Sequence, residues 1–131
     1  MPKNNKTAAL DADRAVAELT ESIIDAIQDV KGVHIVEIDL DSLESAPASK
    51  FVICQGKSTT QVSSIADNIE EKVRERCRIK PYSVDGTRNA QWIVMDYGSV
   101  MAHVFLPEAR DLYNLEELWG DATIREIADL D

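Results

Sequence analysis

The chain has 131 residues, of which 44% are hydrophobic and 29% charged, and its formal net charge is −10. This length predicts one domain with its own core. No apolar run approaches the roughly 18 residues of a membrane span. The polar N-terminus lacks the apolar stretch of a signal peptide and the arginine-rich pattern of a transit peptide, so we expect a cytoplasmic protein. The negative charge disfavours binding to a phosphate backbone without a local basic patch.

The first predicted element is a helix over residues 9–30, preceded by a polar tail, residues 1–8, that we expect to be disordered. Apolar residues recur along this helix at three- and four-residue spacing: Val16, Leu19, Ile23, Ile27 and Val30. Lys31-Gly32 is a helix stop. Residues 33–40 predict a strand, because Val36, Ile38 and Leu40 form one apolar face and the residues between them form a mixed face.

A second strand and a second helix follow a loop that contains Pro47. Residues 51–55 are a continuous apolar run, which is typical of a central strand covered on both faces. The run Ser58-Thr59-Thr60-Gln61 matches a capping box, so a helix is expected from there to about residue 79. The basic residues near its end are Lys72, Arg74, Arg76, Arg78 and Lys80. They favour the negative end of the helix dipole, and contact with RNA is the alternative interpretation.

The C-terminal half is expected to contain a hairpin. Two apolar runs, residues 92–97 and 100–105, flank Gly98-Ser99, which is a signal for a two-residue type II′ turn. The other predicted segments are a short strand at residues 82–84, helical turns at 108–113 and 115–119, and a C-terminal helical extension over 123–131.

These elements predict the order α-β-β-α-β-β-β-α and an α/β fold of mixed type. We expect a single mixed sheet of about five strands packed by helices, because a strand–helix–strand crossover lies beside a hairpin. The main domain is expected over residues 9–122. Free sheet edges could pair two copies, so a homodimer stays an open alternative.

The hairpin register places Trp92 opposite Phe105 and divides the side chains between two faces. The expected core face carries Ile93, Met95, Val100, Ala102 and Val104, with Tyr97 at its edge. The other face carries Trp92, Val94, Asp96, Met101, His103 and Phe105. Aromatic and methionine anchors with a few polar groups are typical of protein-binding surfaces. The alternative is that this face is also core, and Tyr113 and Trp119 could either cover it or extend it.

The two cysteines, Cys54 and Cys77, are expected to be reduced and mostly buried, although their number allows one disulfide. There is no CxxC motif, and both histidines lie far from either cysteine in the sequence. We therefore expect no metal site and no cofactor.

Four stretches of the sequence resemble one known family. They are Phe51-Val52-Ile53-Cys54-Gln55-Gly56-Lys57-Ser58; Val62 with Ile65-Ala66-Asp67; Trp92 to Gly98 with Val100 and His103-Val104-Phe105; and Arg110, Tyr113, Leu115-Glu116 and Leu118-Trp119 with Asp121-Ala122. In this order and spacing the chain resembles the ribosomal silencing factor family, also called the Iojap family.

The resemblance implies a translation repressor with an α/β fold related to nucleotidyltransferases but without known catalysis. Family members bind ribosomal protein fourteen of the large subunit, prevent the subunits from joining, and lower translation when nutrients are scarce. The family's contact surface maps to the hairpin tryptophan and its neighbours. With the aromatic residues around them, the expected partner-binding residues are Trp92, Asp96, Tyr97, Met101, His103, Phe105, Tyr113 and Trp119.

The main alternative is a nucleotidyltransferase-like enzyme. That chemistry needs a Gly-Ser turn followed by paired carboxylates on a strand to hold Mg²⁺. Here Gly56-Lys57-Ser58 is a poor match to that turn, and the pair Asp39 and Asp41 precedes it. After it, the first aspartate on a predicted strand is Asp96, which stands alone. No serine or cysteine is placed with His103 for nucleophilic catalysis. We expect no enzyme, and an adaptor that binds another protein through the same face is the remaining alternative.

Overall fold

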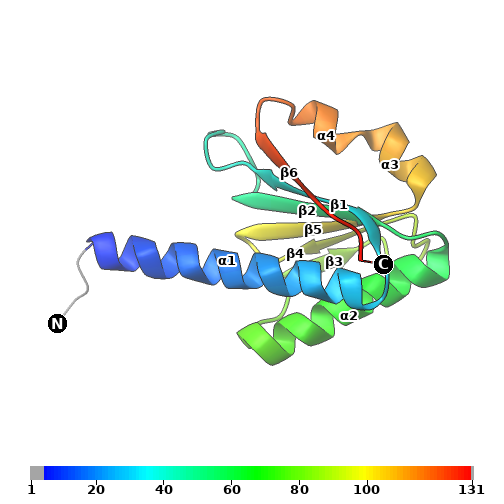
Figure 1. The fold of residues 1–131 in the computed structure, drawn as a ribbon, viewed down its shortest axis with the longest axis horizontal. Helices are drawn as coiled ribbons and strands as arrows, with labels where there is room; N and C mark the ends of the chain where they lie inside the picture. Colours follow the sequence, from blue (N-terminus) through cyan, green and yellow to red (C-terminus); the bar gives the residue numbers. More distant parts are fainter. Residues whose placement is uncertain (1–4, 131) are drawn as a thin grey trace.

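The structure, a computed structural model, describes the backbone of residues 5–130 and the side chains of residues 10–130. In chain order the elements are α1 (Asn5–Asp29), β1 (Val33–Asp39), β2 (Lys50–Gln55), α2 (Thr59–Cys77), β3 (Ser83–Asp85), β4 (Trp92–Asp96), β5 (Val100–Phe105), α3 (Pro107–Tyr113), α4 (Leu115–Leu118) and β6 (Thr123–Ile127). They form one mixed sheet with helices packed against it (Figure 1), which confirms the predicted fold class. No helix in this part of the chain is long and apolar enough to cross a membrane.

The sheet has the strand order β3-β4-β5-β2-β1-β6. Strands β2 and β5 pair in parallel, because α2 follows β2 and carries the chain back to the end of the sheet at which β2 begins. All other neighbouring strands of this sheet pair antiparallel. The four residues Phe51–Cys54 are all buried, which confirms the prediction of a central strand covered on both faces. The hairpin register is also confirmed, with Trp92 opposite Phe105 and Asp96 opposite Met101.

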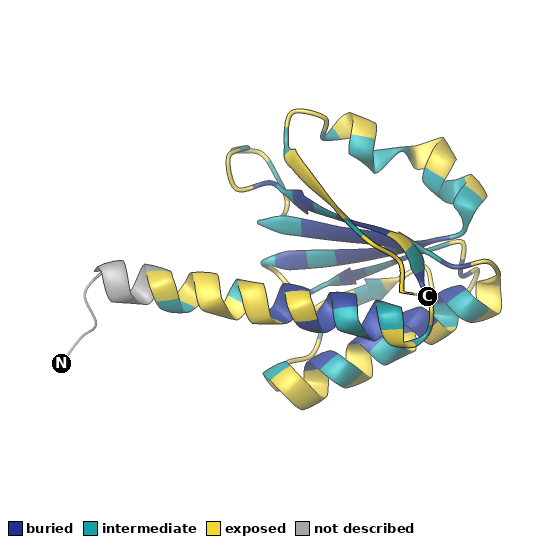
Figure 2. Ribbon diagram, viewed as in Figure 1, coloured by how far each residue is buried: buried dark blue, intermediate teal, exposed yellow. Residues whose placement is uncertain are grey.

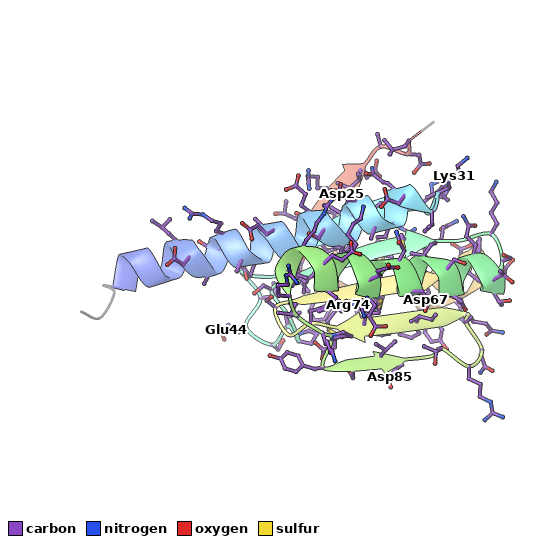
Figure 3. All side chains as sticks on the ribbon, turned by 90° about the horizontal axis from the view of Figure 1, so that it is seen from below. Asp25, Lys31, Glu44, Asp67, Arg74 and Asp85 are labelled. Carbon is purple, nitrogen blue, oxygen red and sulfur yellow. The ribbon has the colours of Figure 1, made fainter. Side chains whose placement is uncertain are left out.

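Helices α1 and α2 lie side by side on one face of the sheet (Figure 3). The apolar stripes of both helices meet the side chains that β2, β4 and β5 send to this face. Two ion pairs join the helices along their outer seam, Lys72 with Asp29 and Arg76 with Asp25 (2.6 Å). Residues 10–18 of α1 project beyond the sheet and are mostly exposed (Figure 2).

The N-terminus of α2 is capped as the sequence predicts. The Gln61 backbone N–H donates to the Ser58 Oγ at 3.1 Å. The Gln61 side chain accepts from the Lys57 N–H at 2.7 Å and donates to the carbonyl of Lys31 at 3.1 Å. It therefore ties the start of α2 to the end of α1 as well as completing the cap.

The structure corrects three predictions about the ends of elements. Helix α1 begins at Asn5, inside the expected disordered tail, because the strong helix formers that follow contain no stop signal; residues 1–4 lie outside the described residues. Helix α2 ends at Cys77 rather than near residue 79, because Arg78 adopts a left-handed conformation with φ of 60°.

The third correction concerns the C-terminus. The expected helical extension over 123–131 instead contains β6, and the sheet has six strands rather than about five. Strand β6 pairs with β1 from Ile35 to Asp39. Its β-branched residues suit a strand, and pairing satisfies backbone groups on β1 that would otherwise form an open edge.

Gly86 supports the position of the Trp92 backbone. Its φ is +88°, and a Cβ at this position would lie 2.0 Å from the Trp92 carbonyl oxygen. Gly86→Ala should lower the free energy of unfolding by about 2 kcal/mol or more, since it combines backbone strain with a clash against backbone. Urea denaturation would measure the change, with the exposed neighbour Thr87→Ala as a control expected within about 0.5 kcal/mol of the natural sequence. Equal stability of the two variants would contradict the packing role of Gly86.

Candidate partner-binding surface

The second face of the sheet is covered only in part. Its core consists of Val36, Ile38, Leu40, Phe51, Ile53 and Phe105. The loop between β1 and β2 and the short helices α3 and α4 pack over this core, chiefly through Leu43, Leu115 and Trp119. This cover reaches β4 only through Tyr113, which contacts Trp92, and both Trp92 on β4 and Met101 on β5 remain half-buried at the margin of the core. The hairpin face that composition left undecided is therefore core at His103 and Phe105 of β5 and half-buried along β4 and at Met101.

Trp92 is the centre of an aromatic cluster at this margin. Its ring stacks on Phe105 at a centroid distance of 5.1 Å and contacts Tyr113 of α3 at 4.5 Å. Its indole N–H donates to the Nδ1 of His103 at 3.1 Å. The indole is thus held on three sides while part of its surface remains open, which is the form of a preorganised binding anchor.

His103 is a buried, neutral member of the same cluster. Its ring packs edge-on against Phe51 at 4.5 Å, and only 4% of the residue is exposed. Burial lowers the pKa of His103 to about 4. Because Nδ1 accepts from Trp92, the imidazole proton is on Nε2, which has no hydrogen-bond partner among the described residues. His103 therefore orients Trp92 through this hydrogen bond from the buried side of the cluster, and it does not face solvent.

The structure divides the eight predicted partner-binding residues into two sets. Trp92, Asp96, Met101 and Trp119 are half-buried and Tyr113 is 51% exposed, and the three aromatic members belong to the same surface. Tyr97, His103 and Phe105 are buried, so their side chains cannot contact a partner without rearrangement. Tyr97 lies in the core under α1 and α2, where burial raises the pKa of its phenol.

Two exposed leucines near this surface were not predicted. Leu112 is 78% exposed on α3 and Leu118 is 69% exposed on α4. Leu118 and Trp119 also line a hollow of about 460 Å³ against the loop residues 42–45. The sequence places these leucines in short helical segments, but it does not show which of their sides faces away from the sheet. We call Trp92, Met101, Tyr113, Leu118 and Trp119 the aromatic surface.

Arg110 attaches the α3–α4 segment to the far end of the sheet. Its guanidinium donates to the carbonyl of His34 at 2.6 Å, to Gln55 Oε1 at 3.2 Å and to Glu116 Oε1 at 3.0 Å. His34 lies at an irregularity in β1 with φ of 52°, which turns its carbonyl toward α3. Because α3 and α4, both fully described, contain no buried residue, this charged contact contributes much of their attachment.

The C-terminal segment that supplies Tyr113, Leu118 and Trp119 to the aromatic surface is acidic. Residues 108–131 hold eight acidic and two basic residues, which gives a net of −6. Of the two basic residues, Arg110 pairs with Glu116 and Arg125 pairs with Glu37 at 2.9 Å. The free charge presented beside the aromatic surface is thus acidic, which favours a basic partner.

The groups considered for catalysis do not converge. Asp96 Oδ1 accepts from the Gly98 N–H in the hairpin turn (2.7 Å), and Asp39 Oδ1 accepts from the Asp41 N–H (3.0 Å). Their strands, β4 and β1, are separated by β5 and β2. Both cysteines are free, and Cys54 is fully buried, which raises its pKa to about 12. Among the described residues no three histidine, cysteine or acidic side chains are grouped to hold a metal ion.

Comparison with known proteins identifies the family. A sequence model described as "Ribosomal silencing factor during starvation" matches residues 13–131. The chain belongs to the ribosomal silencing factor family. The ribosomal silencing factor of Bacillus subtilis is 39% identical over 106 residues, which cover 81% of this chain and 86% of the relative. The resemblance in the hairpin and in the segment after it is therefore confirmed as family membership.

Two further relatives extend the comparison. A crystal structure of a protein from Chromobacterium violaceum matches with a TM-score of 0.76 and 32% identity, covering 80% of this chain and 86% of that one. A mouse protein named "Mitochondrial assembly of ribosomal large subunit protein 1" is 35% identical over 81 residues, covering 60% of this chain and 34% of the mouse protein. The names of the relatives connect the family to translation and to the ribosome.

The buried imidazole of His103 predicts a specific pH dependence. Because its pKa in the folded chain, about 4, lies below the ordinary value of 6.5, the unfolded chain binds a proton between these values and the folded chain does not. The free energy of unfolding should therefore fall by about 2 kcal/mol from pH 7 to pH 5 through this residue, with no contribution above pH 7. Urea denaturation of the natural sequence and of His103→Asn, which keeps an acceptor for Trp92, would isolate the effect. Parallel pH profiles would disprove it.

The Arg110 contacts predict that α3 and α4 can be loosened separately from the sheet. Arg110→Gln should raise the amide hydrogen exchange rate of residues 107–118 by roughly tenfold or more, since it removes charged hydrogen bonds at a partly buried site. Exchange in β2 and β5 should change little. The control is Arg125→Gln, whose exposed guanidinium binds Glu37 on another part of the sheet. Equal acceleration of all elements in Arg110→Gln would contradict a local clamp.

Proposed function

We propose that this member of the family binds ribosomal protein fourteen of the large ribosomal subunit in the cytoplasm. By occupying the face that meets the small subunit, it prevents the two subunits from joining and so represses translation under nutrient limitation. Family membership supports the general role, and the description of the family refers to starvation. The name of the mouse relative refers to the large subunit.

The observation that carries the proposal is the half-buried Trp92 at the centre of the aromatic surface. Side chains of this type, rigidly supported and partly open, are those that contribute most to protein–protein binding. Trp92 is fixed by Phe105, His103 and Tyr113, so little conformational freedom is lost when a partner covers it. Met101 and Trp119 extend the apolar contact on the same face.

The surrounding charge favours a basic protein over RNA at this surface. The acidic residues of α3 and α4 lie at its edge, including Glu108, Asp111 and Glu117. Their field would attract a positively charged ribosomal protein and speed association at low salt. The same field would repel the phosphate backbone of the approaching small subunit, which adds to the steric block.

The proposed mechanism requires binding and no chemistry. An interface of ordinary size buries about 800 Å² on each partner, which the aromatic surface and its polar rim can supply. The nucleotidyltransferase alternative would need converging carboxylates, whereas Asp39 and Asp96 each bond locally on distant strands. Calorimetry with Mg²⁺ and nucleoside triphosphates should therefore give no binding heat.

A ribosome association assay tests the proposal. Adding the natural chain to purified subunits should lower the fraction of joined ribosomes on a sucrose gradient. Trp92→Ala should weaken binding to the large subunit by about 30-fold or more, corresponding to a hot spot of roughly 2 kcal/mol. Unchanged association in the presence of the natural chain would refute the anti-association role.

Two further variants separate lost binding from lost folding. Tyr113→Ser removes a ring that is 51% exposed and contacts Trp92, so it should weaken binding while lowering the free energy of unfolding by only about 1 kcal/mol. Leu10→Ala changes an apolar residue that is 56% exposed on the projecting part of α1 and should leave binding unchanged. Sedimentation velocity should show a monomer. A dimer disrupted by Trp92→Ala would instead assign the aromatic surface to self-association.

A further inference from the structure

A group of unpaired basic side chains stands out on this acidic molecule. Arg74 and Arg78 near the end of α2, Lys80 after it, and Tyr82 before β3 are all exposed, and we call them the basic corner. The three cationic side chains make no hydrogen bond or ion pair with any described residue. The other two cations of this segment, Lys72 and Arg76, are bound to α1. The five basic residues predicted at this helix end thus have two different roles.

Arg74, the first residue of the basic corner, is directed away from the seam between the helices. Arg74 lies on the side of α2 that faces β3, opposite the side that meets α1 (Figure 3). Asp67, on the same side, is about two turns closer to the start of the helix, so this side of α2 changes from acidic to basic along its length. Residues 72–82 contain five basic residues and one acidic residue, Glu75, a net of +4 against −10 for the chain.

Tyr82 adds a fixed aromatic ring to these charges. It is 83% exposed, yet its ring lies against the hairpin turn, since a Cβ at Gly98 would be 2.9 Å from the Tyr82 Cε2. Its backbone N–H donates to the carbonyl of Asp96 at 2.7 Å. A ring held in place with most of its surface open can stack on a nucleic-acid base with little loss of entropy.

We propose that the basic corner binds the phosphate backbone of RNA while the aromatic surface is docked on the large subunit, with Tyr82 stacking on a base. This inference rests on the proposed function. The hairpin turn connects the two regions, because Asp96 lies beside Met101 on β5 and also bonds to Tyr82. A protein site on the ribosome is bordered by RNA, and two arginines and a lysine match phosphates in charge and geometry.

RNA fits this corner better than an acidic protein does. A duplex carries a phosphate charge every few ångströms, so three neighbouring cations can each meet one, and counterion release makes the contact favourable despite the net charge of −10. An exposed tyrosine beside arginines is typical of surfaces that hold unpaired bases. The acidic residues nearby, Glu70 and Glu75 on α2, confine the contact to the end of the helix.

A charge-matched pair of triple variants tests the proposal. The first combines Arg74→Gln, Arg78→Gln and Lys80→Gln. The second combines Lys31→Gln, Lys57→Gln and Arg88→Gln, which removes three exposed cations elsewhere on the chain and gives the same net charge. Affinity for isolated large subunits is measured by fluorescence anisotropy from about 50 to about 200 mM salt.

The expected result is a change in salt dependence that is confined to the first variant. The slope of log K against log salt should become shallower by about 2 to 3, one phosphate contact for each cation removed, while the control keeps the slope of the natural sequence. Tyr82→Leu should weaken binding by roughly tenfold, and Tyr82→Phe, which retains the stacking ring, should not. Binding to the isolated ribosomal protein should be the same for all of these variants.

Each contrary outcome has a separate meaning. If both triple variants keep the natural slope, the basic corner does not contact RNA, although the proposed function stands. If the first variant weakens binding to the isolated ribosomal protein as much as binding to the subunit, the corner binds protein and the RNA assignment is wrong. If the natural sequence does not bind large subunits at all, the proposed function fails, and this inference fails with it.

Discussion

Strand β2 is buried on both faces, and the arrangement of the other elements follows from this constraint. Val52 and Cys54 belong to the core under α1 and α2, whereas Phe51 and Ile53 belong to the opposite core. A strand with apolar side chains on both sides needs a cover on both sides. Two long helices cover the first face, but only a loop and the short helices α3 and α4 are available for the second.

The incomplete second cover explains how an aromatic side chain is both held and open. The cover reaches Phe51 through Trp119 and reaches Trp92 through Tyr113, and then it ends. Trp92 therefore contacts buried rings on one side and solvent on the other. A side chain packed in this way is ordered before a partner arrives, so the contact area that it offers is not offset by a large ordering cost.

Ion pairing separates the structural charges from those left for partners. Lys72 and Arg76 hold the two long helices together, and Arg110 holds the short helices on the sheet. Among the described charges that form no ion pair are Glu108 and Asp111 beside the aromatic surface and the cations of the basic corner at the end of α2. Both regions border the β4–β5 hairpin, one through Tyr113 at Trp92 and the other through Tyr82 at Gly98, which suits a partner made of basic protein and RNA together.

The sequence by itself determined the features that depend on neighbours in the chain. The type of turn at Gly98-Ser99 set the hairpin register, the capping pattern set the start of α2, and the apolar run of β2 marked the centre of the sheet. It also named Trp92 as the anchor of a candidate surface. Each of these follows from alternation, helical periodicity or turn chemistry over a few residues.

Only the tertiary structure decided the features that depend on distant contacts. Strand β6 forms because β1 leaves an edge unpaired, and the short sequence of β6 did not distinguish a strand from a helix. His103 shares the alternation of Trp92, but Phe51 and the elements beyond it bury His103 and leave Trp92 half open. Arg110 reaches a carbonyl 76 residues away. Burial depends on what the rest of the chain places above a residue, and local pattern does not contain that information.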